Sequence, residues 1–164
     1  MVLSLTVVNY KGASKRTEII IWADKLVSDI RLMENNALAV RTFNDDSTRN
    51  VWGVYFDTSA PTNGHYVLYN DANSNNSFNA GETYRDIILP DHIIIESVAG
   101  YIGATATSIS QTSIIFVPPD PQVKFLNNTT EPGYDKLIIT LRDTINGSIK
   151  TITVNFFGVV EVSS

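Results

Sequence analysis

Residues 17–43 read TEIIIWADKLVSDIRLMENNALAVRTF, and this stretch decides the fold that we predict. Its apolar residues recur at steps of 4, 3, 4, 3, 4 and 3, which is the spacing of one face of an α-helix. Most charged and amide residues lie off that face. We therefore expect an amphipathic helix that buries one stripe, formed by Ile19, Ala23, Leu26, Ile30, Met33, Ala37 and Val40.

The helix can begin well before residue 17, because residues 2–9 (VLSLTVVN) are also apolar. Gly12 is its one weak position and costs about 1 kcal/mol relative to alanine. At the other end, residues that favour caps and turns stop the helix, namely Asn44, Asp45, Asp46, Ser47 and Thr48. We assign residues 1–44 to an N-terminal helix and residues 45–164 to a β-rich head, together in one structural domain.

After residue 45 the apolar residues alternate with polar ones, which is typical of half-buried strands. The pair Asn146-Gly147 is a strong hairpin signal, because both residues tolerate a positive φ. The small, polar stretch 100–113 predicts a mobile loop. The predicted strands are 51–56, 65–69, 83–89, 92–98, 113–117, 123–126, 136–141, 149–156 and 159–162.

A helix with a single apolar stripe needs a sheet to cover it, and the alternating strands supply such a face. The predicted fold class is therefore α+β, with a long N-terminal α-helix packed on an antiparallel β-rich head.

Composition excludes several classes of protein. The chain has 164 residues, a hydrophobic fraction of 43% and a net charge of −5, so it can bury a core but is a poor ligand for nucleic acid. It has no cysteine and two histidines, which excludes disulfides, thiol catalysis and thiolate metal sites. No apolar run reaches the roughly 18 residues that a membrane-spanning helix needs.

One segment carries a metal-binding pattern. The sequence DANSNNSFNAGE, residues 71–82, places oxygen-bearing side chains at positions 1, 3, 5, 7, 9 and 12 of a twelve-residue window. This is the spacing of an EF-hand calcium loop, which wraps six to eight hard oxygens around Ca²⁺. The predicted ligands are Asp71, Asn73, Asn75, Ser77 through its carbonyl, Asn79 and Glu82.

Two features make this an unusual calcium loop. Position 6 is Asn76 instead of glycine, although asparagine is the next best residue for a positive φ. Only Asp71 and Glu82 are charged, so binding would be weak, on the order of 10⁻⁴–10⁻³ M. Phe78, at position 8, would anchor the loop to the core. Calcium would have a structural role, and the alternative is an asparagine-rich surface turn without metal.

No other group of residues predicts chemistry, and we expect no enzyme activity. Asp57, His65 and a serine could be combined into a triad, but the chain has no Gly-x-Ser-x-Gly motif. Asp45 and Asp46 are better explained as a helix-end turn than as an acid–base pair. The strand aromatics are expected to pack in the core, although they could form a sugar-binding platform: Trp52, Tyr55, Tyr66, Tyr69 and Tyr84.

The order of these segments resembles the type IV pilin-like subunits, above all the minor pseudopilins of type II secretion and the minor pilins of type IV pili. The likeness covers nearly the whole chain, through individually loose motifs. They are LSLTVVNYK (3–11), ADKLVSDIRLMENNA (23–37), GVYF (53–56), YVLYND (66–71), GE (81–82), IFVPPD (115–120) and ITVNFFGVVEV (152–162).

The resemblance implies a structural subunit of an extracytoplasmic filament whose partners are other pilin-like subunits. Such subunits sit in the periplasm or at the cell surface and are anchored in the inner membrane before assembly. The chain shows neither the family's cleavage site nor its apolar anchor, and we expect that the membrane segment precedes Met1. The alternatives are a calcium-dependent adhesion module that binds through Tyr66 and Tyr69, and a hydrolase.

Overall fold

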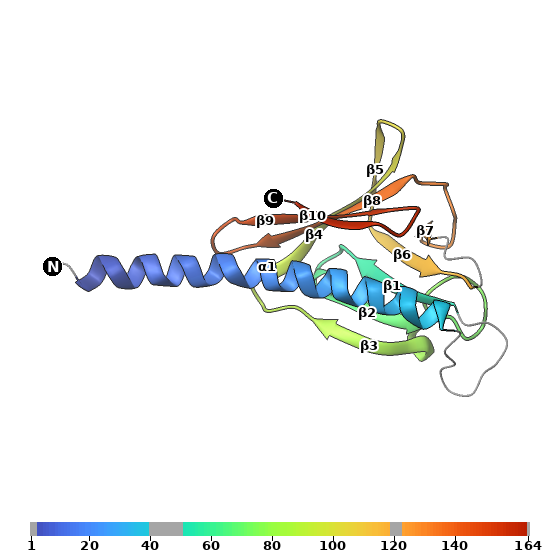
Figure 1. Ribbon diagram of the computed structural model, residues 1–164, viewed down its shortest axis with the longest axis horizontal. Coiled ribbons are helices and arrows are strands. Elements are labelled where there is room, and N and C mark those ends of the chain that lie inside the picture. The colour runs from blue at the N-terminus through green and yellow to red at the C-terminus, as the bar shows by residue number, and fades with distance from the viewer. Residues whose placement is uncertain (1–2, 40–50, 119–122, 164) are drawn as a thin grey trace.

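The computed structural model describes residues 3–39, 51–118 and 123–163, with only the backbone of residues 3–16. Helix α1 (Leu3–Leu38) precedes two five-stranded antiparallel sheets (Figure 1). The first sheet has the order β3-β2-β1-β6-β7 and the second β10-β9-β8-β4-β5. Two 3₁₀ turns, η1 (Thr62–Gly64) and η2 (Ala80–Glu82), flank β2 and β3. The strands are β1 (Trp52–Asp57), β2 (His65–Asn70), β3 (Thr83–Ile88), β4 (Ile93–Ile102), β5 (Thr105–Ile109), β6 (Gln111–Phe116), β7 (Val123–Asn127), β8 (Lys136–Asp143), β9 (Ile149–Asn155) and β10 (Val160–Ser163).

The inner faces of the two sheets form one core. In the first sheet Val54 lies opposite Leu68 on β2 and Ile114 on β6, and all three side chains are buried. In the second sheet Ile139 lies opposite Val98 and Ile152, which are buried too. These residues belong to the same hydrophobic cluster. The two sheets therefore pack face to face, with every second residue of these strands pointing into the core between them.

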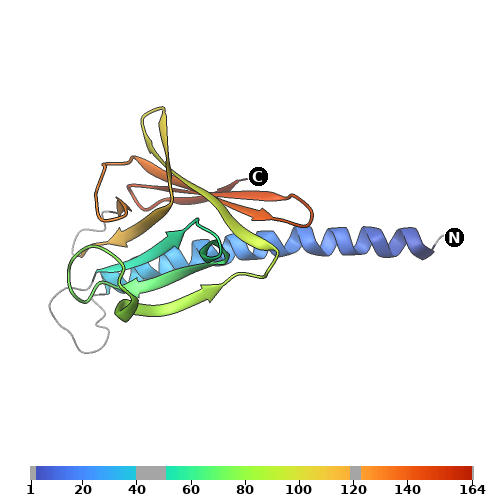
Figure 2. The same ribbon diagram turned by 180° about the vertical axis from the view of Figure 1, so that it is seen from behind.

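Helix α1 completes this core by contacting both sheets. It packs against β1 and β6 of the first sheet and against β8, β9 and β10 of the second. Six stripe residues are buried in the shared cluster, and the seventh, Val40, lies outside the described residues. The N-terminal turns of α1 extend beyond the sheets in both views (Figures 1 and 2).

A buried polar contact also holds α1 to β2. The Tyr66 hydroxyl donates to Oδ2 of Asp29 at 2.6 Å, and Lys25 pairs with the same oxygen at 2.8 Å. Asp29 and Tyr66 are both buried. Because a hydrogen bond to a charged group contributes more than one between neutral groups, this contact ties α1 to β2 in addition to the apolar packing.

The predicted fold class, α+β with a long N-terminal α-helix on a β-rich head, is wrong. Over the described residues the structure is mostly β: ten strands form two antiparallel sheets that pack against each other, and one helix packs against both, so the fold is β-sandwich-like. The physical reason lies in how the strands are shared. Local periodicity shows only that the helix and each strand bury one face. It does not show that the strands form two sheets, which pack against each other as well as against the helix.

The nine predicted strands all occur, but the prediction of a mobile loop over residues 100–113 is wrong. That stretch contains the end of β4, the whole of β5 and the start of β6. Four residues of β5 are exposed, so the sequence there lacks the alternation that marks a half-buried strand. The predicted helix end at residues 44–48, and with it the boundary between helix and head, lies outside the described residues.

Candidate calcium-binding loop

The Asp71–Glu82 loop connects β2 to β3 at one end of the first sheet and is the green loop that leads into β3 (Figure 2). Its start is held against β1. The Asp71 N–H donates to the Val51 carbonyl at 2.9 Å, and the Asn70 side-chain amide donates to the same oxygen at 3.0 Å. The loop therefore leaves the sheet from a fixed backbone position.

Asp71 lies inside the loop and organises its first half. Its side chain is fully buried. Oδ1 accepts the N–H of Asn75 at 3.1 Å, and Oδ2 accepts the N–H of Asn76 at 2.8 Å. The chain therefore curls around this carboxylate, as it must around the first ligand of a calcium loop.

The middle ligands of the predicted set follow the same curl. Oδ1 of Asn73 accepts the N–H of Asn75 at 3.0 Å, and Oδ1 of Asn75 accepts the N–H of Ser77 at 2.8 Å. The Ser77 carbonyl, the predicted seventh-position ligand, accepts the Asn79 side-chain amide at 3.0 Å. Each of these three oxygens is thus positioned by a hydrogen bond within the loop.

Two residues of the loop adopt left-handed backbone. Ser74 has φ of 59° and Asn76 has φ of 58°. Asn76 stands at position 6, where EF-hand loops use glycine for a sharp turn, and asparagine tolerates that conformation better than other non-glycine residues. The turn predicted for position 6 is therefore present.

Glu82 closes the loop from its far end. Its Oε1 accepts the N–H of Asn73 at 3.3 Å, across the loop, and its Oε2 accepts the N–H of Asn79 at 3.0 Å. Together with the Asn79 side chain it forms a capping box on η2. The carboxylate at position 12 therefore spans the loop that begins at Asp71.

Phe78 attaches the loop to the outer face of the first sheet. Its ring centroid lies 4.8 Å from that of Tyr55 and 5.4 Å from that of Tyr69. It packs against a second hydrophobic cluster that includes Ile115 and Leu126. Phe78, at position 8 of the loop, therefore packs against buried residues, as expected for an anchor.

The charges of the loop fit a bound cation. Asp71 is 0% exposed and Glu82 is 5% exposed. Buried carboxylates are costly unless they are paired, yet among the residues that the structure describes no Lys, Arg or His forms an ion pair with either one. Burial, and then the charges of Asp71 and Glu82, raise the pKa of Tyr69. A hard divalent cation would neutralise both carboxylates.

The rest of the ligand set would be uncharged. Over the described ranges, no three or more His, Cys, Asp or Glu side chains are grouped so that they could hold a metal. The remaining oxygens would come from the asparagine amides and the Ser77 carbonyl, which are ligands that calcium accepts. The six-residue set remains a prediction as a metal site.

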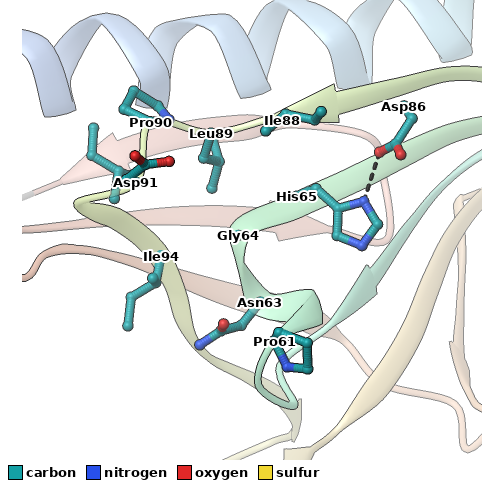
Figure 3. Close-up of a pocket in the computed structure, with 11 residues that line it drawn as sticks. Pro61, Asn63, Gly64, His65, Asp86, Ile88, Leu89, Pro90, Asp91 and Ile94 are labelled. Atoms are coloured by element: carbon teal, nitrogen blue, oxygen red, sulfur yellow. Dashed lines mark hydrogen bonds and ion pairs between the residues drawn. The ribbon is translucent and has the colours of Figure 1, made fainter.

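A second polar site was not predicted from the sequence. His65 Nδ1 lies 2.6 Å from Asp86 Oδ1 on the neighbouring strand β3 (Figure 3). The pair borders a pocket of about 440 Å³ lined also by Asn63 and Asp91. Asp57, the residue that the triad hypothesis places beside His65, accepts a hydrogen bond from Gln111 instead. Only the strand register brings His65 and Asp86 together, and periodicity does not reveal register.

The tyrosines that the adhesion alternative requires are not on the surface. Tyr66 is 1% exposed and Tyr69 is 0% exposed. Trp52 is buried as well, so the prediction that these aromatics pack in the core is confirmed for these three.

No protein-family model, curated protein or solved structure matches the chain. No helix within the described residues is both long and apolar enough to cross a membrane. The function is therefore proposed from the residues of the chain itself.

Proposed function

We propose that the chain is a non-catalytic structural subunit of an extracytoplasmic filament and that calcium in the Asp71–Glu82 loop stabilises its head. Its partners would be further copies or related subunits. The observation that carries the proposal is the extension of α1 beyond the sheets (Figures 1 and 2). The resemblance of the sequence motifs to pilin-like subunits supports it further.

The helix offers a surface for neighbouring subunits. At 1.5 Å per residue, the 36 residues of α1 measure about 54 Å. Near the point where the helix leaves the sheets, Ile20 is 42% exposed and Ile21 is 58% exposed. Adjacent exposed isoleucines are costly in water, and a neighbouring helix in a filament would cover them.

Calcium would stabilise the head and would take no part in a chemical reaction. Asp71 and Glu82 would supply the charged ligands, while the asparagine amides and the Ser77 carbonyl would complete the shell. The ion would neutralise two buried carboxylates and so order the loop over the cluster under Phe78. A weak site suits millimolar calcium outside the cell.

Calorimetric titration tests the calcium part of the proposal. Calcium is expected to bind at one site with a Kd on the order of 10⁻⁴–10⁻³ M, and magnesium more weakly, because magnesium sheds water reluctantly. Asp71→Asn should abolish binding. Asp24→Asn removes the same charge from the exposed side of α1 and should leave binding intact. Equal binding by both variants would place calcium elsewhere.

The filament part needs a separate experiment. Antibodies against the head should label filaments sheared from the surface of cells that express the full protein. Variants with Ile20→Asp and Ile21→Asp should fold yet fail to enter the filaments. Recovery of the unmodified protein only as a freely diffusing species, never in filaments, would contradict the proposal.

A further inference from the structure

Strand β5 is an open sheet edge. It pairs with β4 on one side only and ends the second sheet. The β4–β5 hairpin stands away from the rest of the head in both views (Figures 1 and 2). Residues 105–108 are all exposed. An edge of this kind can accept another strand through its free backbone groups.

The hairpin geometry identifies which backbone groups are free. Ile102 and Thr105 are opposite each other across the two-residue loop Gly103–Ala104, and Gly103 has a positive φ. A two-residue loop is closed by a hydrogen-bonded pair, and antiparallel pairs alternate between bonded and non-bonded. Thr105 and Thr107 therefore bond to β4, while the N–H and C=O groups of Ala106 and Ser108 point outward.

The edge is held in place before any partner binds. The Gly103 N–H donates to Asp135 Oδ2 at 2.6 Å, and the Asp135 N–H donates to the Tyr101 carbonyl at 2.7 Å. The Tyr134 ring lies against Gly100, where an added Cβ would be 2.5 Å from a ring carbon. Such bracing lowers the entropy that strand pairing would cost.

The charge pattern indicates what pairs with this edge. Residues 97–118 contain no Asp, Glu, Lys or Arg, although the whole chain carries a net charge of −5. The other three sheet edges contain charged residues, which natural proteins use to block edge pairing. They are Glu161 on β10, Lys124 on β7, and Arg85 with Asp86 on β3.

We infer that two copies of this chain pair β5 to β5, antiparallel, around a two-fold axis at Thr107. The outward groups of Ala106 would then bond to those of the partner's Ser108, and the reverse. Thr107 would face the partner's Thr107 as a non-hydrogen-bonded pair, which is a favourable cross-strand pair. Two anionic copies would meet at an uncharged strand and form one continuous sheet.

Cysteine cross-linking tests the register directly, because the chain has no cysteine of its own. In this register two Thr107→Cys residues have Cα atoms about 4.5 Å apart, within the range of a disulfide. Two Ala106→Cys residues are diagonal neighbours about 7–8 Å apart, beyond that range. Under a mild oxidant, T107C should form a disulfide-linked dimer, whereas A106C should form no disulfide and run as a monomer once the protein is denatured.

A second variant tests the pairing without a covalent bond. Ala106→Pro removes only an outward N–H, which an edge strand tolerates, so the fold should survive. Sedimentation at increasing protein concentration should show dimers for the natural chain and monomers for A106P, with equal circular dichroism. The inference is overturned if T107C stays monomeric, if A106C cross-links as fast, or if A106P dimerises like the natural chain.

Discussion

Removing the Asp71 carboxylate should abolish the effect of calcium on thermal stability. A ligand that binds only the folded state stabilises it by RT ln(1 + [L]/Kd). With two charged ligands and a Kd of about 0.1–1 mM, about 10 mM calcium contributes about 1.4–2.7 kcal/mol. For a chain of this size each kcal/mol raises the melting temperature by about 2–4 °C, so the rise should be about 3–11 °C.

The assay is thermal unfolding followed by circular dichroism, in chelator, in calcium and in magnesium at matched ionic strength. Asp71→Asn keeps the size of the side chain but removes one of two buried charges, so its melting temperature should be the same with and without calcium. Asp24→Asn should keep the full rise. The reasoning is refuted if the natural chain melts at the same temperature in chelator and calcium, or if Asp71→Asn keeps the rise.

Three further substitutions test how the head holds together. Phe78→Ala should lower the free energy of unfolding by about 2 kcal/mol, because the ring is half-buried against Tyr69, and should weaken calcium binding. An unchanged calcium affinity would show that the Phe78 contact does not hold the loop in its binding conformation. Tyr66→Phe should lower the free energy of unfolding in urea by about 1–3 kcal/mol, because the buried Asp29 carboxylate loses one of its two donors and keeps only Lys25; a neutral result would mean that water replaces the hydroxyl. Leu26→Ala should cost about 2–5 kcal/mol in the same assay, and a loss under 1 kcal/mol would show that the helix is not part of the core.

The strands could be predicted from the sequence because their side chains alternate between core and solvent. In β9, Ile152 and Val154 are buried while Thr151 and Thr153 are not. Strand β5 cannot be predicted in this way because Thr105 and its neighbours are exposed, and a strand without a buried face has no period-two signal. The division of ten strands between two sheets depends on long-range pairing, which local periodicity does not encode.

The candidate loop could be located from the sequence because its ligands lie within twelve consecutive residues. Spacing alone places Asp71 and Glu82 at its two ends, and the structure shows the hydrogen bonds that each one accepts. The pair formed by His65 and Asp86 could not be found in this way. Its members are 21 residues apart, and only the pairing of β2 with β3 brings them together.

The position of Phe78 between Tyr55 and Tyr69 gives the loop an optical reporter. An aromatic ring held in a chiral, rigid environment produces a near-ultraviolet dichroism signal, and that signal fades when the ring rotates freely. Any event that tightens or loosens the loop should therefore change the tyrosine bands without altering the strand signal at shorter wavelength. The chain carries an intrinsic chromophore for its own loop, so occupancy can be followed without a label.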